Sequence, residues 1–306
     1  METTAKYQPN VEVASDSEDL AHRAADLFVW SAREAIQARG RFFIALSGGH
    51  TPKRAFEVLA ASPVARGLAW EKIHIFWVDE RYVPPDSPQS NYRLAAETLL
   101  DKVPIPADNV HRIPTEQEDI SVSARAYEQT IRDVLALKPN EMPQFDLIVL
   151  GMGADGHTGS LLPNSYAPFD GDDLACAVYV KGEVLNRITL TYPVMQAARH
   201  LAVLVSGAEK AHTLKDVLAG EPDEVRYPIH LLWPVLDKML WLVDRQAAQD
   251  LKRRGSESRD RAGRTTSVGN DELGAGSDLV GVSDYVTIGV EDLLPAVGGA
   301  VIELRY

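Results

Sequence analysis

The sequence predicts an α/β fold in which a mainly parallel sheet is flanked by helices in a Rossmann-like three-layer arrangement, with an extra C-terminal segment. Three observations lead to this prediction. Short apolar runs at 42–46, 73–78 and 147–150 are too short for helices and are typical of buried strands. Apolar residues between them recur every three or four positions, as on a helix with one buried face. Several runs end in glycine-rich or charged loops, the pattern of strand–loop–helix units.

The N-terminal part of the chain contains the first of these units. A short strand at 11–13 is followed by N-cap candidates at 15–17 and a helix to about Arg39, which Gly40 ends. The run at 42–46 leads into Ser47-Gly-Gly-His-Thr-Pro52, and Pro52 suits the first turn of a helix over 52–61.

The next unit begins with the strand at 73–78, which ends in the charged loop Asp79-Glu-Arg81. The proline-rich stretch 83–88 must be a loop. Helices are expected over 90–100 and 122–135, ahead of the strand at 147–150.

The later elements are less uniform. Polar and apolar residues interleave at 175–180 and 187–192, which indicates a sheet edge or an antiparallel patch. A short helical segment starts at Pro193. Buried strands are expected at 200–205 and 239–243, with a helix between them that carries Lys210 in its first turn and ends at Gly220.

Three regions follow from the change in composition near residue 250. Residues 1–250 form the main domain, 251–280 a flexible linker rich in Ser, Thr and Gly, and 281–306 a C-terminal extension. The extension regains apolar character at 285–288 and 301–304. It is expected to make a strand pair or to dock on the main domain.

Composition limits the class of partner. The 306 residues are 45% hydrophobic and 25% charged, as in a globular protein with a core, and the net charge is −13. This charge argues against nucleic acid or anionic membrane as a partner, but a few cations and helix N-termini still bind a small phosphate. With no signal segment, no membrane span and a single cysteine, Cys176, we expect a cytoplasmic protein that is a monomer or small homo-oligomer.

Four loops follow strands at positions where parallel sheets bind ligands. They are 47–52, 79–81, 151–159 and 206–210, and in a parallel sheet they converge on one rim beyond the carboxyl ends of the strands. The 151–159 loop holds four glycines around Asp155 and His157, two groups that move or hold protons. The alternative reading of this loop is a tight structural turn with a solvated Asp and His.

The other loops contain groups suited to an anion. The loop that contains Gly48 and Gly49 exposes backbone N–H groups at a helix start and has the Ser47 and Thr51 hydroxyls. These groups suit a phosphate, although the loop is not a P-loop. Cation candidates are Arg81, Arg187 and Lys210. Asp79 is a candidate for orientation or proton transfer, and the alternative for 79–81 is a solvated rim with a local ion pair. A metal site from Asp79, Asp155 and His157 is conceivable, but their spacing does not favour one.

The ordered motifs resemble one known family, the 6-phosphogluconolactonases. The resemblance covers about residues 11–250 and is carried by Ser47–Pro52, Asp79–Arg81 with Ser90–Tyr92, Gly151–Pro163, Arg187–Thr191, Ser206–Lys210 and Trp241–Asp244. It implies an α/β fold related to the glucosamine-6-phosphate isomerase/deaminase fold. It also implies hydrolysis of 6-phospho-D-glucono-1,5-lactone in the pentose phosphate pathway, with no organic cofactor and no metal.

The resemblance also assigns roles to individual residues. His157 matches the family's general base, Arg81 and Lys210 its phosphate-contacting cations, and Ser47–Thr51, with Gly48 and Gly49, its sugar-phosphate loop. Arg187 matches an arginine facing the substrate, Gly153 belongs to the binding loop, and Asp79 and Asp155 match acidic positions of less certain role. Two positions depart from the pattern: His50 stands where Ser or Thr is usual, and Gly159 where Ala is commoner.

The chemistry expected from these residues is general-base hydrolysis of an activated ester. We expect His157 to activate water, Asp155 to fix its tautomer, and backbone N–H groups of the glycine loop to stabilise the oxyanion. Two rivals stay open. One is an amino-sugar-phosphate isomerase or deaminase with Asp79 as base, and the other is a non-catalytic sugar-phosphate sensor.

Overall fold

The computed structural model describes residues 9–163, 165–167, 171–180, 185–251 and 300–303. Its larger sheet has the strand order β12-β1-β11-β10-β6-β2-β3-β5. All of its neighbours are parallel except β12, which runs antiparallel to β1. These strands are β1 (Asn10–Ala14), β2 (Phe42–Leu46), β3 (Ile73–Trp77), β5 (Val110–His111), β6 (Leu147–Gly151), β10 (Leu201–Val205), β11 (Met239–Asp244) and β12 (Ala300–Glu303). The predicted α/β fold with a mainly parallel sheet is therefore confirmed.

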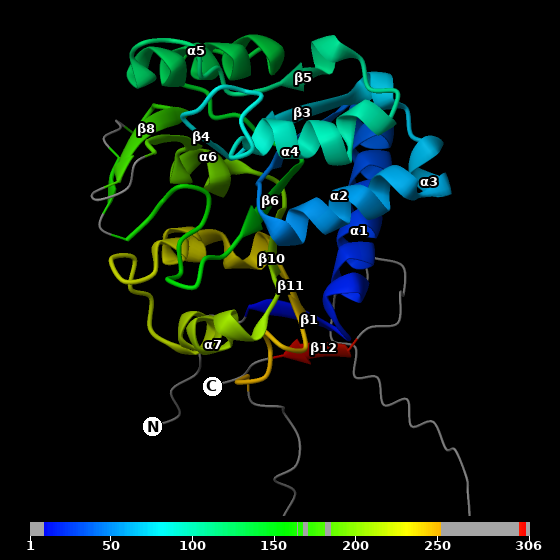
Figure 1. Cartoon of the computed structure of the whole chain (residues 1–306), viewed down its shortest axis with the longest axis vertical. Coiled ribbons are helices and arrows are strands. Elements are labelled where there is room, and N and C mark those ends of the chain that lie inside the picture. The colour runs from blue at the N-terminus through cyan, green and yellow to red at the C-terminus, as the bar shows by residue number, and fades with distance from the viewer. Residues whose placement is uncertain (1–8, 164, 168–170, 181–184, 252–299, 304–306) are drawn as a thin grey trace, which may run out of the picture.

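Helices lie on both sides of this sheet (Figure 1). The α-helices are α1 (Ser17–Arg39), α2 (His50–Ala61), α3 (Pro63–Arg66), α4 (Asn91–Thr98), α5 (Ile120–Val134), α6 (Tyr192–Ala197) and α7 (Ala211–Ala219). The 3-10 helices are η1 (Trp70–Lys72), η2 (Leu100–Lys102), η3 (Ala107–Asn109), η4 (Ala208–Lys210) and η5 (Pro228–Lys238). None of the helices in the described part of the chain has the length and apolar character that a bilayer crossing requires.

The two faces of the sheet are covered by different helices. Phe28 of α1 and Phe56 of α2 line the same small apolar cavity as Leu204 of β10. On the opposite face, Trp233 of η5 packs edge-on against Trp241 of β11, with 6.1 Å between ring centroids. Trp241 is aligned with Val203, whose side chain points away from that of its neighbour Leu204. The sheet is thus buried on both faces, which explains its continuous apolar strands.

A smaller antiparallel sheet lies beside the first, in the order β4-β9-β8-β7. Its strands are β4 (Asp79–Arg81), β9 (Arg187–Leu190), β8 (Ala175–Val180) and β7 (Ser165–Tyr166). The antiparallel patch expected for 175–192 is confirmed. Residues 79–81, however, were expected to be a loop and instead form the edge strand β4, because pairing with β9 supplies their backbone partners.

One residue joins the two sheets. Val78 lies between β3 and β4, and its N–H donates to Leu46 O at 2.9 Å while its carbonyl accepts from Leu190 N at 2.7 Å. The adjacent Trp77 is held by Tyr127 of α5, whose hydroxyl donates to Trp77 O and accepts from Trp77 N. The chain that leaves the central sheet is therefore fixed on both sides just before Asp79.

Other predictions differ from the structure at the ends of elements. Helix α2 begins at His50 rather than Pro52, and α4 ends at Thr98, ahead of the short η2. The strand β5 and the helix η5 were not predicted. The tail strand expected at 301–304 corresponds to β12, whereas 285–288 and most of the linker lie outside the described residues.

Candidate active site

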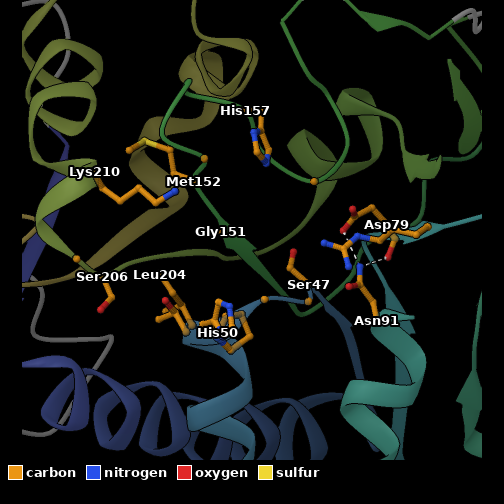
Figure 2. Close-up of a pocket in the computed structure, with 18 of the residues that line it drawn as sticks. Ser47, His50, Asp79, Asn91, Gly151, Met152, His157, Leu204, Ser206 and Lys210 are labelled. Carbon is orange, nitrogen blue, oxygen red and sulfur yellow. Dashed lines mark hydrogen bonds between the residues drawn. The ribbon is translucent and has the colours of Figure 1, made fainter. Parts of the chain in front are cut away.

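The four predicted loops meet at one cleft of about 460 Å³ beyond the carboxyl ends of β2, β6 and β10 (Figure 2). The cleft brings together ten of the eleven residues predicted for the site. They are Ser47, Gly48, Gly49, Thr51, Asp79, Arg81, Gly153, His157, Arg187 and Lys210. Asp155, the eleventh, contacts His157 directly. Convergence of the loops is therefore confirmed.

The loop after β6 presents the His157 ring to the cleft. His157 Nδ1 lies 2.6 Å from Asp155 Oδ1, and Gly153 N donates to His157 O at 2.9 Å. A Cβ on Gly153 would overlap the His157 ring and Asp155 Oδ1, so glycine at this position leaves room for the pair. Thr213 of α7 holds the outside of the loop by donating to Ala154 O at 2.6 Å.

The Asp155 carboxylate determines the tautomer of His157. The hydrogen bond from His157 lowers the pKa of Asp155 to about 2, so this group is ionised throughout the neutral range. A carboxylate only accepts, so Nδ1 carries the proton and Nε2 of the neutral ring is left as the basic nitrogen.

Three backbone N–H groups of the glycine loop are not available to an oxyanion, contrary to the expectation from the sequence. Gly153 N donates to His157 O, Gly156 N to Gly153 O, and His157 N to Asp155 Oδ1. For these three N–H groups the prediction is wrong, because the loop uses them to close its own turn.

The start of α2 is open towards the cleft. Its N-cap, Gly49, has φ of 109° and supplies no side-chain cap. Helical N–H groups in the first turn lack intrahelical acceptors, so an uncapped helix start is suited to an anion. Ser47 is 5% exposed, and its Oγ has no hydrogen-bond partner among the described residues. A buried hydroxyl of this kind indicates a ligand partner.

The opposite wall of the cleft is built by β4 and β9. Arg81 and Arg187 are directly paired across these two strands, and both line the cleft. Like charges directly opposite each other in a sheet are destabilising, and an anion bound beside them would offset their repulsion. Arg81 Nη1 donates to Gln89 O at 2.9 Å, while its buried Nε has no partner within the described residues.

Two acidic residues of β4 are buried. Asp79 is 5% exposed and accepts from Ser160 Oγ at 2.7 Å, and Glu80 is 2% exposed. The alternative of a solvated rim is therefore wrong for both residues. Asp79 lines the cleft, whereas Glu80 accepts four hydrogen bonds from the protein.

Lys210 enters the cleft from the side opposite Asp79 (Figure 2). It belongs to η4 and immediately precedes α7, rather than lying within the first turn of that helix. The loop ahead of it is held by buried Asp244, which accepts from Ser206 Oγ at 2.5 Å and from Gly207 N at 3.2 Å.

Comparisons with known proteins agree with this geometry. Residues 15–241 match the family model described as glucosamine-6-phosphate isomerases/6-phosphogluconolactonase. The chain belongs to this family. It is 42% identical over 241 residues to the 6-phosphogluconolactonase of Nostoc sp., covering 79% of this chain and 98% of that protein. It is 41% identical to the Synechocystis sp. 6-phosphogluconolactonase, and the match covers 80% of this chain and 99% of that protein. The solved 6-phosphogluconolactonase from Trypanosoma cruzi matches with a TM-score of 0.71 at 27% identity. That match covers 82% of this chain and 99% of the solved chain.

The two departures from the family pattern lie at the cleft. His50 lines it from the first position of α2. Gly159 has φ of 53°, and a Cβ there would lie 3.1 Å from both Thr189 Oγ1 and Val78 Cγ1. The left-handed backbone and the tight contacts explain glycine at this position.

Several cleft residues were not assigned from the sequence. Asn91, Ser206 and Glu209 also line the cleft. All three stand within the motifs that carried the family resemblance, but a spacing pattern does not show which side chains turn inward. Among the described residues, no group of three or more His, Cys, Asp or Glu side chains is placed to hold a metal ion.

Proposed function

We propose that this chain hydrolyses 6-phospho-D-glucono-1,5-lactone to 6-phospho-D-gluconate, with His157 as general base. The observation that carries the proposal is a histidine with a fixed tautomer in the same cleft as two arginines that face each other. Such a cleft offers a base for water and a site for an anionic sugar. The names of the relatives support the same reaction.

His157 handles both proton transfers. His157 Nε2 takes a proton from water as the water oxygen bonds to the lactone carbonyl carbon. The resulting oxyanion collapses, the bond from that carbon to the ring oxygen breaks, and the imidazolium returns its proton to the ring oxygen. Asp155 stabilises the transient imidazolium through the Nδ1 hydrogen bond.

The charges of the cleft supply binding and stabilise the transition state. Arg81, Lys210 and the open start of α2 hold the phosphate, and Arg187 faces the substrate beside Arg81. Asp79 accepts a hydrogen bond from a sugar hydroxyl and so orients the ring. Three amides of the glycine loop are already used, so the positive charge of the cleft contributes to stabilising the oxyanion.

The decisive test is His157→Asn with hydrolysis measured against the spontaneous opening of the lactone. Loss of a general base lowers kcat by about 100- to 10,000-fold. His212→Asn is a matched control, because His212 is 78% exposed on its side chain, has an acidic neighbour in Asp216, and does not line the cleft. Turnover by a folded His157→Asn protein close to that of the control would refute the assignment.

The family also contains isomerases, so amino-sugar phosphate chemistry is the competing activity. It requires Asp79 as a base. Asp79 instead accepts hydrogen bonds from Ser160 Oγ and from the Asn91 amide, which suits orientation better than proton transfer. Release of ammonia from glucosamine 6-phosphate would favour the competitor, and binding of sugar phosphates without turnover would favour a sensor.

The proposed activity places the chain in the oxidative pentose phosphate pathway, without an organic cofactor. A cytoplasmic location, the oligomeric state and the roles of residues 251–306 remain predictions from the sequence.

A further inference from the structure

The Asn91 side chain lies between two walls of the cleft that come from different sheets (Figure 2). Its Nδ2 donates to Asp79 O at 2.9 Å and approaches Asp79 Oδ1 at 3.5 Å. On its other side, the amide fills the space where a side chain of residue 48 would begin, and a Cβ on Gly48 would overlap Asn91 Oδ1. Asn91 is 3% exposed, so the amide has little freedom to move away.

The orientation of Asn91 is set by Glu80, the neighbour of Asp79. The Glu80 carboxylate accepts from Ser90 Oγ, Asn91 N and Tyr92 N at 2.8–2.9 Å, and from Arg81 N at 2.8 Å. The first three donors lie at the start of α4, where backbone N–H groups lack helical partners and a negative charge is favoured. The carboxylate therefore ties α4 to β4 and holds Asn91 at a fixed distance from Asp79.

We propose that Asn91 is a positioning residue, which spaces Asp79 from the Gly48 backbone and orients the Asp79 carboxylate towards the substrate. Asn91 Nδ2 restrains one oxygen of Asp79 and Ser160 Oγ the other, so the carboxylate presents one orientation to the cleft. The same amide requires glycine at position 48, because any side chain there would overlap it. The inference rests on the proposed function, in which Asp79 accepts a hydrogen bond from a sugar hydroxyl and so orients the ring.

The first experiment compares Asn91→Ala with Asn109→Ala. Asn109 is a matched control, because it is 8% exposed, donates its amide to Glu71 O at 3.1 Å, and lies outside the cleft. In Asn91→Ala, kcat should fall by at least about tenfold, because small misplacements in a site are costly. The KM should change much less, since Asn91 does not touch the cations that hold the phosphate. A kcat equal to that of the control, or an effect on KM alone, overturns the proposal.

The second experiment tests the contact with Gly48 by a double-mutant cycle. Residue 48 does not have a positive φ, so Gly48→Ala is compatible with the backbone and acts through its Cβ. Gly48→Ala should lower kcat/KM by about tenfold or more in the wild-type background and have little effect in Asn91→Ala. Equal effects in both backgrounds overturn the proposal.

The same cycle is measured on binding of 6-phosphogluconate by calorimetry, where Gly48→Ala should weaken binding only when Asn91 is present. Absence of lactone hydrolysis by the wild-type chain would refute the proposed function. Absence of coupling between positions 48 and 91 in an active, ligand-binding chain would refute the role of Asn91 alone.

Discussion

The pairing of His157 with Asp155 concentrates the proposed acid–base chemistry in two residues of one turn. The turn tolerates this pairing because Gly153 leaves room for the ring and Gly156 adopts φ of 77°. Gly156 also lies under the Tyr227 ring, so a Cβ there would meet Tyr227 Cδ1. The catalytic geometry therefore depends on glycines that carry no chemistry themselves.

Asp155→Asn tests whether the charge next to His157 contributes to turnover. The asparagine oxygen still accepts from Nδ1, but it no longer stabilises the imidazolium, so kcat should fall by at least about tenfold. In the wild type the pKa of Asp155 is about 2. The carboxylate is therefore charged at every pH where the enzyme would be assayed, and it loses its charge only as the pH falls towards 2. An acidic limb of kcat/KM above pH 4 should therefore be kept in the variant. Disappearance of that limb would show that Asp155 itself titrates there.

At the level of elements, the edge of the central sheet contains a pair of histidines outside the cleft. His74 of β3 and His111 of β5 stack with their rings 9° from parallel, and Nδ1 of the first lies 3.1 Å from Nε2 of the second. Phe76 packs on His111 and Phe43 on His74, and Arg41 lies over Phe43. The hydrogen bond between His74 Nδ1 and His111 Nε2 exists only while one of these two nitrogens carries no proton and can accept.

This pair should make stability depend on pH. Burial, and then the charge of His74, lowers the pKa of His111 to about 4, and burial and Arg41 lower the pKa of His74. In the folded protein both histidines have pKa values below the ordinary value of about 6.5, so the unfolded chain binds more protons. The contribution of the pair to the free energy of unfolding is therefore complete above about pH 6.5 and is lost as the pH falls towards 4. His111→Gln should reduce this loss, measured as urea midpoints from pH 7 to pH 4. An unchanged pH dependence would contradict the prediction.

At the level of the whole molecule, the cleft is assembled from elements between β2 and α7, and the strands next to the tail lie at the far edge of the sheet. The order β12-β1-β11-β10 places β12 three strands from β10, the nearest strand that contributes to the cleft. The match to the Nostoc relative covers 79% of this chain and 98% of that protein. Within the described part of the chain, no residue after Lys210 lines the cleft, so we expect the cleft walls to form without the segment after residue 251.

Truncation after Leu251 should leave lactone hydrolysis close to that of the full chain. Loss of the β12 ladder on β1 should cost on the order of 1 kcal/mol of stability, because β1 keeps its parallel partner β11. For a chain of this size, that corresponds to a decrease in melting temperature of about 2–4 °C. Loss of folding or of activity would show that the tail is integral to the domain.

The sequence alone determined the strand–loop–helix order, the family and the loops that meet at the cleft. These features depend on near neighbours, because apolar periodicity and a glycine, proline or charged residue at a strand end act within a few positions. Periodicity did not reveal that α2 begins at His50, or that amides of the glycine turn bond within the turn. Both features depend on individual hydrogen bonds, which periodicity does not predict.

Tertiary structure decided which distant side chains touch. Arg81 faces Arg187 only because residues 79–81 pair as a strand with β9 in one particular register, and a slip of one residue would place the two side chains on opposite faces. Asn91 fills the space above Gly48 only because Glu80 fixes the start of α4. These contacts join residues tens of positions apart, where no periodicity links them, so sheet register and packing alone bring them together.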